Sequence, residues 1–192
     1  MENLNVIIQG CIDGDPKYQR MVYDGYRSYA LKIVFRYIYR YEKAEDVVTD
    51  GFMKAFNHFN GFKKESDENL EKVLMGWLKR IMINCAIDEL RKDNMLPEIG
   101  GIPDDVWDIT DKSDNADVLL LYKELISQVK QLPPNYRIIF NLHVVDGYSH
   151  SEIAHMMNIS TSTSRSGLAR AKTILQGRIN KTEQYKYAAY RS

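Results

Sequence analysis

The sequence predicts an all-α protein: two small helical domains joined by a flexible acidic linker, the C-terminal one containing a helix-turn-helix. Three observations lead to this prediction. Apolar residues recur at spacings of three and four along most of the 192 residues, without alternating strand patterns. One segment near the middle, rich in proline, glycine and acidic residues, breaks this periodicity. A short capped helix followed by a hydroxyl-rich helix occupies the last third of the chain.

Charge is unevenly distributed, although 26 basic and 26 acidic side chains cancel overall. Residues 93–117 carry eight acidic side chains and one basic one, whereas residues 118–192 carry ten basic and four acidic ones. A basic C-terminal half indicates an anionic partner. No apolar run is long enough to cross a bilayer and the N-terminus has no basic leader, so we expect a cytoplasmic protein that is not embedded in a membrane.

Three amphipathic helices are predicted before the linker. Their apolar stripes run over residues 16–41, 44–59 and 74–85, and the third helix ends near residue 92. After the linker, residues 118–132 predict a helix stopped by Pro133, and Pro134 opens another helix, which Gly147 ends. The predicted organisation is a domain at 1–92, a linker at 93–117, a domain at 118–180 and a C-terminal tail at 181–192.

The helix-turn-helix prediction rests on residues 149–175. Ser149 and Glu152 fit a capping box that starts a helix of about two turns. Asn158 then stands where the chain must turn sharply, and asparagine tolerates the left-handed backbone that such a turn needs. Ser160 caps the next helix.

In this motif the second helix lies in the DNA major groove. Short hydroxyl side chains allow close approach to base edges, and Arg165 can make a bidentate contact to guanine, whereas Arg170 and Lys172 are better placed for phosphates. The alternative is a surface helix whose hydroxyls satisfy only its own amides and whose cations are solvated. The candidate contacts are Thr161, Ser162, Thr163, Arg165, Ser166, Arg170 and Lys172.

A second candidate surface lies on the third helix, opposite its apolar stripe. There we interpret Asp88 and Arg91 as an i,i+3 ion pair on a solvated face. The other polar and aromatic residues on and near this helix are the inventory that holds single-stranded DNA and pockets its unpaired bases. They are Phe62, Lys63, Lys64, Trp77, Lys79, Arg80 and Asn84.

Three blocks together resemble the bacterial RNA polymerase sigma factors of the extracytoplasmic function (ECF) group. The resemblance extends from about Asp15 to Arg178. The first block, "AEDVVTDGFMKAFNHF", is similar to the helix that binds the clamp of core polymerase. The second, "WLKRIMINCAIDELRK", is similar to the helix that reads the minus-ten element. The third, "LPPNYRIIFNLHVVDGYSHSEIAHMMNISTSTSRSGLARAK", is similar to the domain that reads the minus-thirty-five element.

The resemblance implies specific roles. Asp46, Asp50 and Phe52 would contact polymerase. Arg80 and Asn84, with the loop from Phe62 to Lys64, would capture the unpaired minus-ten base. Trp77 would lie near the point of strand separation or in the core. Arg165, Ser166 and Arg170 would contact the upstream element.

The implied partners are core RNA polymerase, promoter DNA and an anti-sigma factor. The family implies no cofactor, no metal and no enzymatic activity of the chain itself. Two positions depart from the family pattern: Gly167 stands where a long polar or basic side chain is usual, and Ser164 where an apolar one is usual.

Two other functions compete with this interpretation. A conventional helix-turn-helix regulator would bind duplex DNA without core polymerase, but the cluster around Arg80 and Asn84 suits unpaired DNA better than a ligand pocket. An enzyme or zinc protein would have to use His143, His150 and His155, whose spacing does not fit the usual metal-binding arrangement.

Overall fold

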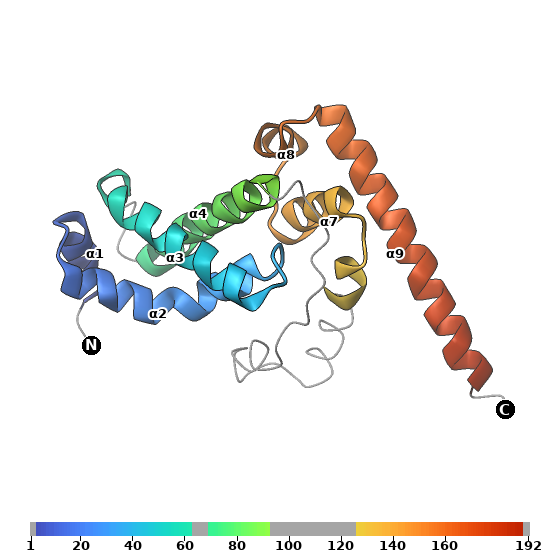
Figure 1. Ribbon diagram of the computed structural model, residues 1–192, viewed down its shortest axis with the longest axis horizontal. Helices are drawn as coiled ribbons and strands as arrows, with labels where there is room; N and C mark the ends of the chain where they lie inside the picture. Colours follow the sequence, from blue (N-terminus) through green and yellow to red (C-terminus); the bar gives the residue numbers. More distant parts are fainter. Residues whose placement is uncertain (1–2, 63–68, 93–125, 190–192) are drawn as a thin grey trace. The chain divides into compact units, whose positions relative to one another are not determined.

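A computed structural model describes residues 3–62, 69–92 and 126–189, with side chains as far as residue 178. Every regular element within these ranges is helical, which confirms the all-α prediction (Figure 1). The described residues before position 93 form one compact unit and those from position 126 onward form a second. The predicted linker, residues 93–117, lies outside the described residues, and the predicted domain boundaries therefore stay a prediction.

The first unit begins with a helix that the periodicity analysis did not predict. Asn3 caps α1 by accepting a hydrogen bond from the amide of Asn5, and Asp15 caps α2 in the same way, with Pro16 in the first helical position. The elements of this unit are α1 (Leu4–Ile12), α2 (Pro16–Val34), α3 (Tyr41–Asn57), the short 3-10 helix η1 (Phe59–Gly61) and α4 (Leu70–Lys92).

The helix α2 is shorter than predicted, because its stripe continues into a segment that is not helical. Residues 37–39 are all buried, with at most 1% of each side chain exposed. The helix ends at its C-cap Phe35, and the chain buries this segment as a turn that leads to α3.

The core of the first unit lies between α2, α3 and α4, which run side by side in Figure 1 and pack against one another. Gly51 allows α3 to approach α4 closely, because a Cβ atom there would lie 2.5 Å from Sδ of Met82. The side chains with no more than 1% exposure include Val34, Ile38, Ala44, Val48, Phe52, Ala55, Phe59, Leu74, Leu78, Met82, Ile83 and Ala86.

The second unit contains the helix-turn-helix. Residues 126–130 are helical, as predicted for the described part of that segment. The single helix predicted from Pro134 divides into an α-helix and a wider π-helical turn, and the last helix extends through most of the predicted tail. The elements are α7 (Pro134–Phe140), the π-helical turn η3 (Asn141–Val145), α8 (His150–Met157) and α9 (Thr161–Ala189).

Two arginines hold the end of the 126–130 helix in place. The guanidinium of Arg178 on α9 donates to the carbonyl oxygens of Gln128 and Gln131 at 3.1 and 3.2 Å. Arg137 on α7, only 2% exposed, donates to the carbonyl of Lys130 at 3.2 Å. These bonds supply side-chain donors to carbonyl groups at and just beyond the helix end, where intrahelical donors run out. Arg178 therefore has a structural partner within the second unit.

Candidate nucleic-acid interface

The turn between α8 and α9 has the geometry that the sequence predicts. Ser149 Oγ accepts a hydrogen bond from the amide of Glu152 at 3.2 Å, and the Glu152 carboxylate accepts one from the amide of Ser149 at 2.8 Å. Asn158 ends α8 with φ 52° and ψ 48°, in the left-handed region. Ser160 Oγ then caps α9 by accepting from the amide of Thr163 at 2.9 Å. The capping box, the left-handed turn and the second cap are all confirmed.

One face of α9 is exposed and carries the predicted contacts. Thr161 is half-buried, whereas the other six predicted residues, from Ser162 to Lys172, are exposed. The hydroxyls of Thr163 and Ser166 already have partners, because Thr163 Oγ1 lies 2.8 Å from Ser160 Oγ and Ser166 donates to the Thr163 carbonyl at 3.1 Å. These two hydroxyls therefore make hydrogen bonds within their own helix, as expected if α9 were a surface helix without a DNA contact.

The opposite face of α9 packs against the rest of the unit and explains both departures from the family pattern. Ser164 is 0% exposed, and its hydroxyl lies 2.9 Å from Nδ1 of His150. Gly167 is buried, and a Cβ atom there would lie 2.6 Å from Cδ1 of Ile139 on α7. A long side chain at position 167 could not serve as a DNA contact in this structure, because the position faces α7 and has no room for one.

His150 also stacks on a second histidine. Its ring lies 4.4 Å from that of His143, with 13° between the ring planes. Burial, followed by the positive charges of His143, Arg165 and Lys172, lowers the pKa of His150. Within the described residues, no group of three or more His, Cys, Asp or Glu side chains is placed to hold a metal ion.

In the first unit, the structure brings Trp77 and Asn84 together in one pocket. Its volume is about 330 Å³, near the lower end of the ~300–1,000 Å³ that small-molecule sites occupy. Burial raises the pKa of the Cys85 thiol that lines the pocket, so this group is neutral at physiological pH. The lining residues are Lys54, His58, Trp77, Ile81, Asn84 and Cys85.

Sequence reasoning missed two pocket residues at the end of α3, Lys54 and the C-cap residue His58. The ring Nδ1 of His58 donates to the carbonyl of Lys54 at 2.8 Å, which leaves Nε2 as the acceptor of the neutral ring. The ammonium group of Lys54 lies 3.7 Å from the carboxylate of Asp88, which also pairs with Arg91 at 3.5 Å as predicted. The spacing of four residues between Lys54 and His58 places both on one helix face, and this was the available signal.

The other predicted minus-ten residues do not all join this pocket. Arg80 is exposed and Lys79 is half-buried on α4, outside the pocket lining, whereas Lys63 and Lys64 lie outside the described residues. The base-capturing role implied for Phe62 needs an accessible ring, but only 7% of this residue is exposed. Its ring packs 5.9 Å from Phe59 and 5.4 Å from Trp77. Phe62 therefore closes the core beneath Trp77 and presents no ring for stacking on a base.

The acidic residues predicted on α3 are exposed. Asp46 and Asp50 line one shallow pocket together with cations from α3 and α4. Phe52, in contrast, is 1% exposed and packs edge-on against Tyr23 at 5.0 Å. The expected polymerase contact by Phe52 is therefore wrong for this conformation, because its ring belongs to the core. The exposed apolar side chain on this helix is its neighbour, Met53, at 57% exposure.

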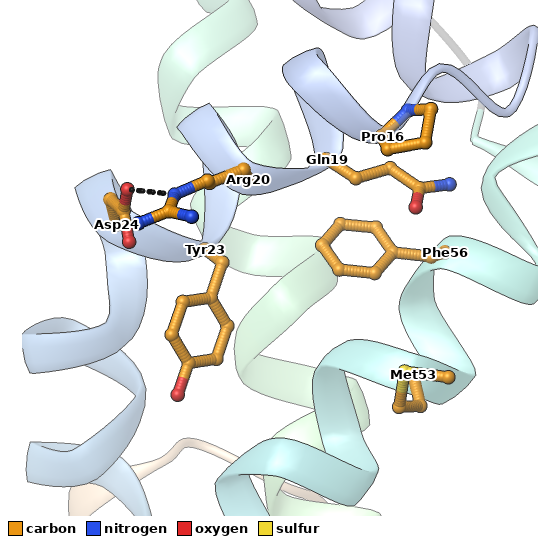
Figure 2. A pocket seen from close by; sticks show the side chains of 7 residues that line it. All are labelled: Pro16, Gln19, Arg20, Tyr23, Asp24, Met53 and Phe56. Carbon is orange, nitrogen blue, oxygen red and sulfur yellow. Dashed lines mark ion pairs between the residues drawn. The ribbon is translucent and has the colours of Figure 1, made fainter.

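Met53 also borders an open groove between α2 and α3. Figure 2 shows the groove, in which Met53 and Phe56 face the side chains of α2. Its edge carries an ion pair between Arg20 and Asp24, with 3.5 Å between nitrogen and oxygen. The lining residues are Pro16, Gln19, Arg20, Tyr23, Asp24, Met53 and Phe56. This groove extends the acidic surface of α3 with an apolar area.

Comparison with known proteins gives matches in both units. The family described as "Sigma-70 region 2" matches residues 22–95, and "Sigma-70, region 4" matches residues 122–175. The ECF RNA polymerase sigma-E factor of Escherichia coli (strain K12) is 25% identical over 193 residues, covering 91% of this chain and 93% of that protein. The protein of the same name from Haemophilus influenzae is 24% identical over 189 residues, covering 90% and 93%.

A solved structure, that of CnrH in complex with the cytosolic domain of CnrY, is also similar. It has 18% sequence identity and a TM-score of 0.46, with 92% of this chain and 96% of that chain covered.

The two family matches lie in the order and in the units where the fold places a base-sized pocket and a helix-turn-helix. Together they define the class of protein, a transcription initiation factor of RNA polymerase. The chain belongs to the sigma-70 family, and within it to the ECF group. It is an alternative sigma factor, a DNA-binding protein that directs promoter-specific transcription. No helix in the described part of the chain is long and apolar enough to cross a membrane.

Proposed function

We propose that this sigma factor reads two promoter elements in two physical states. The helix α9 reads the minus-thirty-five element as duplex, and the pocket on α4 captures an unpaired base of the minus-ten element. The observation that carries the proposal is the pocket shared by Trp77 and Asn84. An amide, an aromatic ring and a nearby lysine around a space of that size suit one flipped base rather than a duplex.

Each side chain of the pocket has a distinct role in this proposal. The Asn84 amide offers both a donor and an acceptor to a base edge, and Nε2 of His58 offers a further polar group. Trp77 offers a face for stacking, and Lys54 lies close enough to attract a phosphate of the same strand. Arg80, Lys79, Lys63 and Lys64 extend the positive surface that guides the strand. Phe62 has no part in these assignments, because its ring is buried.

On α9, Arg165 reads base edges, and Ser162, Thr163 and Ser166 line the same exposed face. Arg170 and Lys172 bind phosphates or a neighbouring base. Phosphate contacts of this kind make binding weaken steeply as salt concentration rises.

Core RNA polymerase binds the exposed face of α3 in this proposal. Asp46 and Asp50 offer negative charge to a basic partner surface, and Met53 adds an apolar contact beside them. The chemical step of RNA synthesis belongs to the polymerase, and this chain supplies none. We further propose that the protein acts in the cytoplasm and that an anti-sigma protein holds it inactive, as its membership of the ECF group suggests.

The experiment that tests the base pocket compares Asn84→Ala with wild type in transcription by reconstituted holoenzyme. The template is a promoter identified by transcript sequencing after the chain is overproduced. We expect transcription from the duplex template to fall by about fivefold or more, because one lost base contact is worth about 1–3 kcal/mol. Binding to core polymerase should not change. A template already unpaired at the minus-ten element should recover part of the loss, because less energy is then needed to flip the base.

The matched control is Asn135→Ala, which removes an exposed asparagine from α7 in the other unit. It should transcribe like wild type on both templates. Equal transcription by wild type and Asn84→Ala would refute the base-capturing role. Loss of core binding in Asn84→Ala would instead assign this residue to the polymerase contact.

A further inference from the structure

The close approach of α7 to α9 at Gly167 brings a tyrosine alongside the recognition helix. A Cβ atom at Gly167 would lie 2.6 Å from Cδ1 of Ile139 and 3.7 Å from Cδ1 of Tyr136. Ile139 is only 1% exposed, so it has little space into which it could move. Any side chain at position 167 would therefore push α7 away from α9, and the ring of Tyr136 with it.

The hydroxyl of Tyr136 reaches a residue one turn further along α9. Nη1 of Arg170 donates a hydrogen bond to Oη of Tyr136 at 3.0 Å. This bond to the charged guanidinium raises the pKa of Arg170. Arg170 is exposed at the surface, where an arginine without such a bond would sample many rotamers. The half-buried tyrosine thus restrains an otherwise mobile cation on the recognition face.

We infer that Tyr136 is a positioning residue for promoter recognition, which holds the Arg170 guanidinium in its binding orientation before DNA arrives. The inference rests on the proposed role of α9 in reading duplex DNA. A guanidinium has five N–H groups, so one bond to Tyr136 leaves Nε and Nη2 to make a paired contact with a guanine edge or a phosphate. Restraint in the free protein lowers the entropic cost of that contact on binding. Gly167 contributes by letting Tyr136 lie close enough to reach Arg170.

The test measures sequence preference with Tyr136→Phe, Arg170→Ala and the double variant. Holoenzyme formed from core polymerase and the full chain binds a pool of duplexes whose upstream element is randomised, and the bound and free fractions are sequenced at several salt concentrations. We expect Arg170→Ala to weaken preference at its own base pairs, or to weaken all binding with a shallower salt dependence if its contact is to phosphate. Tyr136→Phe should weaken binding in the same pattern by about threefold to tenfold.

The double variant provides the decisive comparison, because Tyr136 acts only through Arg170. It should bind no more weakly than Arg170→Ala alone. Tyr148→Phe, the same chemical change at another half-buried tyrosine of the second unit, should bind like wild type. Additive losses in the double variant, or an unchanged Tyr136→Phe, would overturn the inference while leaving α9 as the DNA reader. An unchanged Arg170→Ala would overturn both the inference and the proposed role of Arg170.

A second readout does not depend on DNA. In full-length protein labelled with ¹⁵N-arginine, restricted rotation should give Arg170 resolved Nη signals that broaden or average in Tyr136→Phe. The Arg178 side chain, which donates to two backbone carbonyls, serves as the internal reference and should be unaffected. Averaged Arg170 signals in the wild-type protein would show that Tyr136 does not restrain it and would refute the inference.

Discussion

Gly51 shows how a single missing side chain sets the distance between two helices of the first unit. It lies in the middle of α3, where glycine costs helix stability of about 1 kcal/mol relative to alanine. The close contact with Met82 explains why this cost is tolerated, since the 2.5 Å separation from Sδ leaves no room for a methyl group. Met82 is 0% exposed, so its thioether has no open space to move into.

We therefore predict opposite effects of alanine at two helical glycines. Gly51→Ala should lower the free energy of unfolding by about 1–3 kcal/mol, the usual cost of overpacking a core. Gly25→Ala on α2, where a Cβ atom meets nothing within 4 Å, should raise it by about 0.5–1 kcal/mol through helix propensity. Urea unfolding of the two variants measures both effects. An equal rise in the free energy of unfolding of both variants would show that the contact between α3 and α4 leaves room for a methyl group at Gly51.

Residues at the edge of an apolar stripe are where sequence reasoning failed at this scale. Phe52 and Met53 are neighbours on α3, about 100° apart around the helix axis. Apolar periodicity shows that one face of a helix is buried, but it does not show whether a residue at the edge of that face is buried or exposed. The structure buries Phe52 and exposes Met53, whereas the family resemblance implied an exposed contact at Phe52. The prediction for Phe62 was wrong for a related reason. Its sequence neighbours are polar, and its packing against Phe59 and Trp77 arises only in the folded structure.

At the scale of the helix, His150 links α8 to α9 through its contact of 2.9 Å with the hydroxyl of Ser164. Burial and the nearby positive charges of His143, Arg165 and Lys172 lower its pKa below the ordinary value of 6.5. The nearby acidic group on the same helix, the Glu152 carboxylate, already accepts hydrogen bonds from the amide and from the hydroxyl of Ser149, both at 2.8 Å. These bonds hold Glu152 at the helix start. The unfolded chain, whose histidine keeps its ordinary pKa, therefore binds a proton more readily than the folded unit does.

The sign of the pH effect follows from this difference. The stability that neutral His150 supports is fully present above pH 6.5 and is lost as the pH falls below that value towards the lowered pKa. We predict that lowering the pH from about 7.5 to about 5.5 reduces the stability of the second unit less in His150→Gln than in wild type. Denaturant unfolding followed on the backbone NMR signals of α8 and α9 reports this unit alone.

His155→Gln is the matched control, because His155 is an exposed histidine on the same helix outside the stack. It should leave the pH dependence of unfolding as it is in wild type. If His150→Gln also follows the wild-type pH profile, the stacked pair does not control stability and another group must titrate.

The helices differ in how far sequence determines them. The element from Ser149 to Thr161 was predictable in detail, because caps and a left-handed asparagine are local signals carried by single residues. The helix α1 was missed because its nine residues give too short a stripe, and its start depends on one capping asparagine. The end of α2 and the π-helical turn η3 depend on burial against other segments, which local periodicity does not contain.

At the scale of the whole molecule, charge separates the two proposed binding activities between the two units. The acidic groups Asp46 and Asp50 belong to the first unit, and the exposed cations of α9 belong to the second. The division into domains, the all-α class and the sigma-factor family were accessible from sequence because each rests on long blocks rather than on one residue. The α3 side of the proposed base pocket was not accessible, since it depends on which faces of α3 and α4 meet.

This separation predicts that polymerase binding can be removed without affecting DNA reading by α9. The double charge reversal Asp46→Lys with Asp50→Lys should reduce capture of core polymerase by at least about tenfold, because like charges then face each other across the interface. Asp13→Lys with Glu71→Lys changes the net charge equally at exposed positions on other parts of the first unit and should leave capture intact. Both double variants should bind a duplex minus-thirty-five element equally when assayed without polymerase, because the second unit is unaltered. If the two double variants reduce capture of core polymerase equally, net charge rather than the α3 surface controls the association. The polymerase contact must then lie elsewhere on the first unit, and the groove beside Met53 is the first place to test.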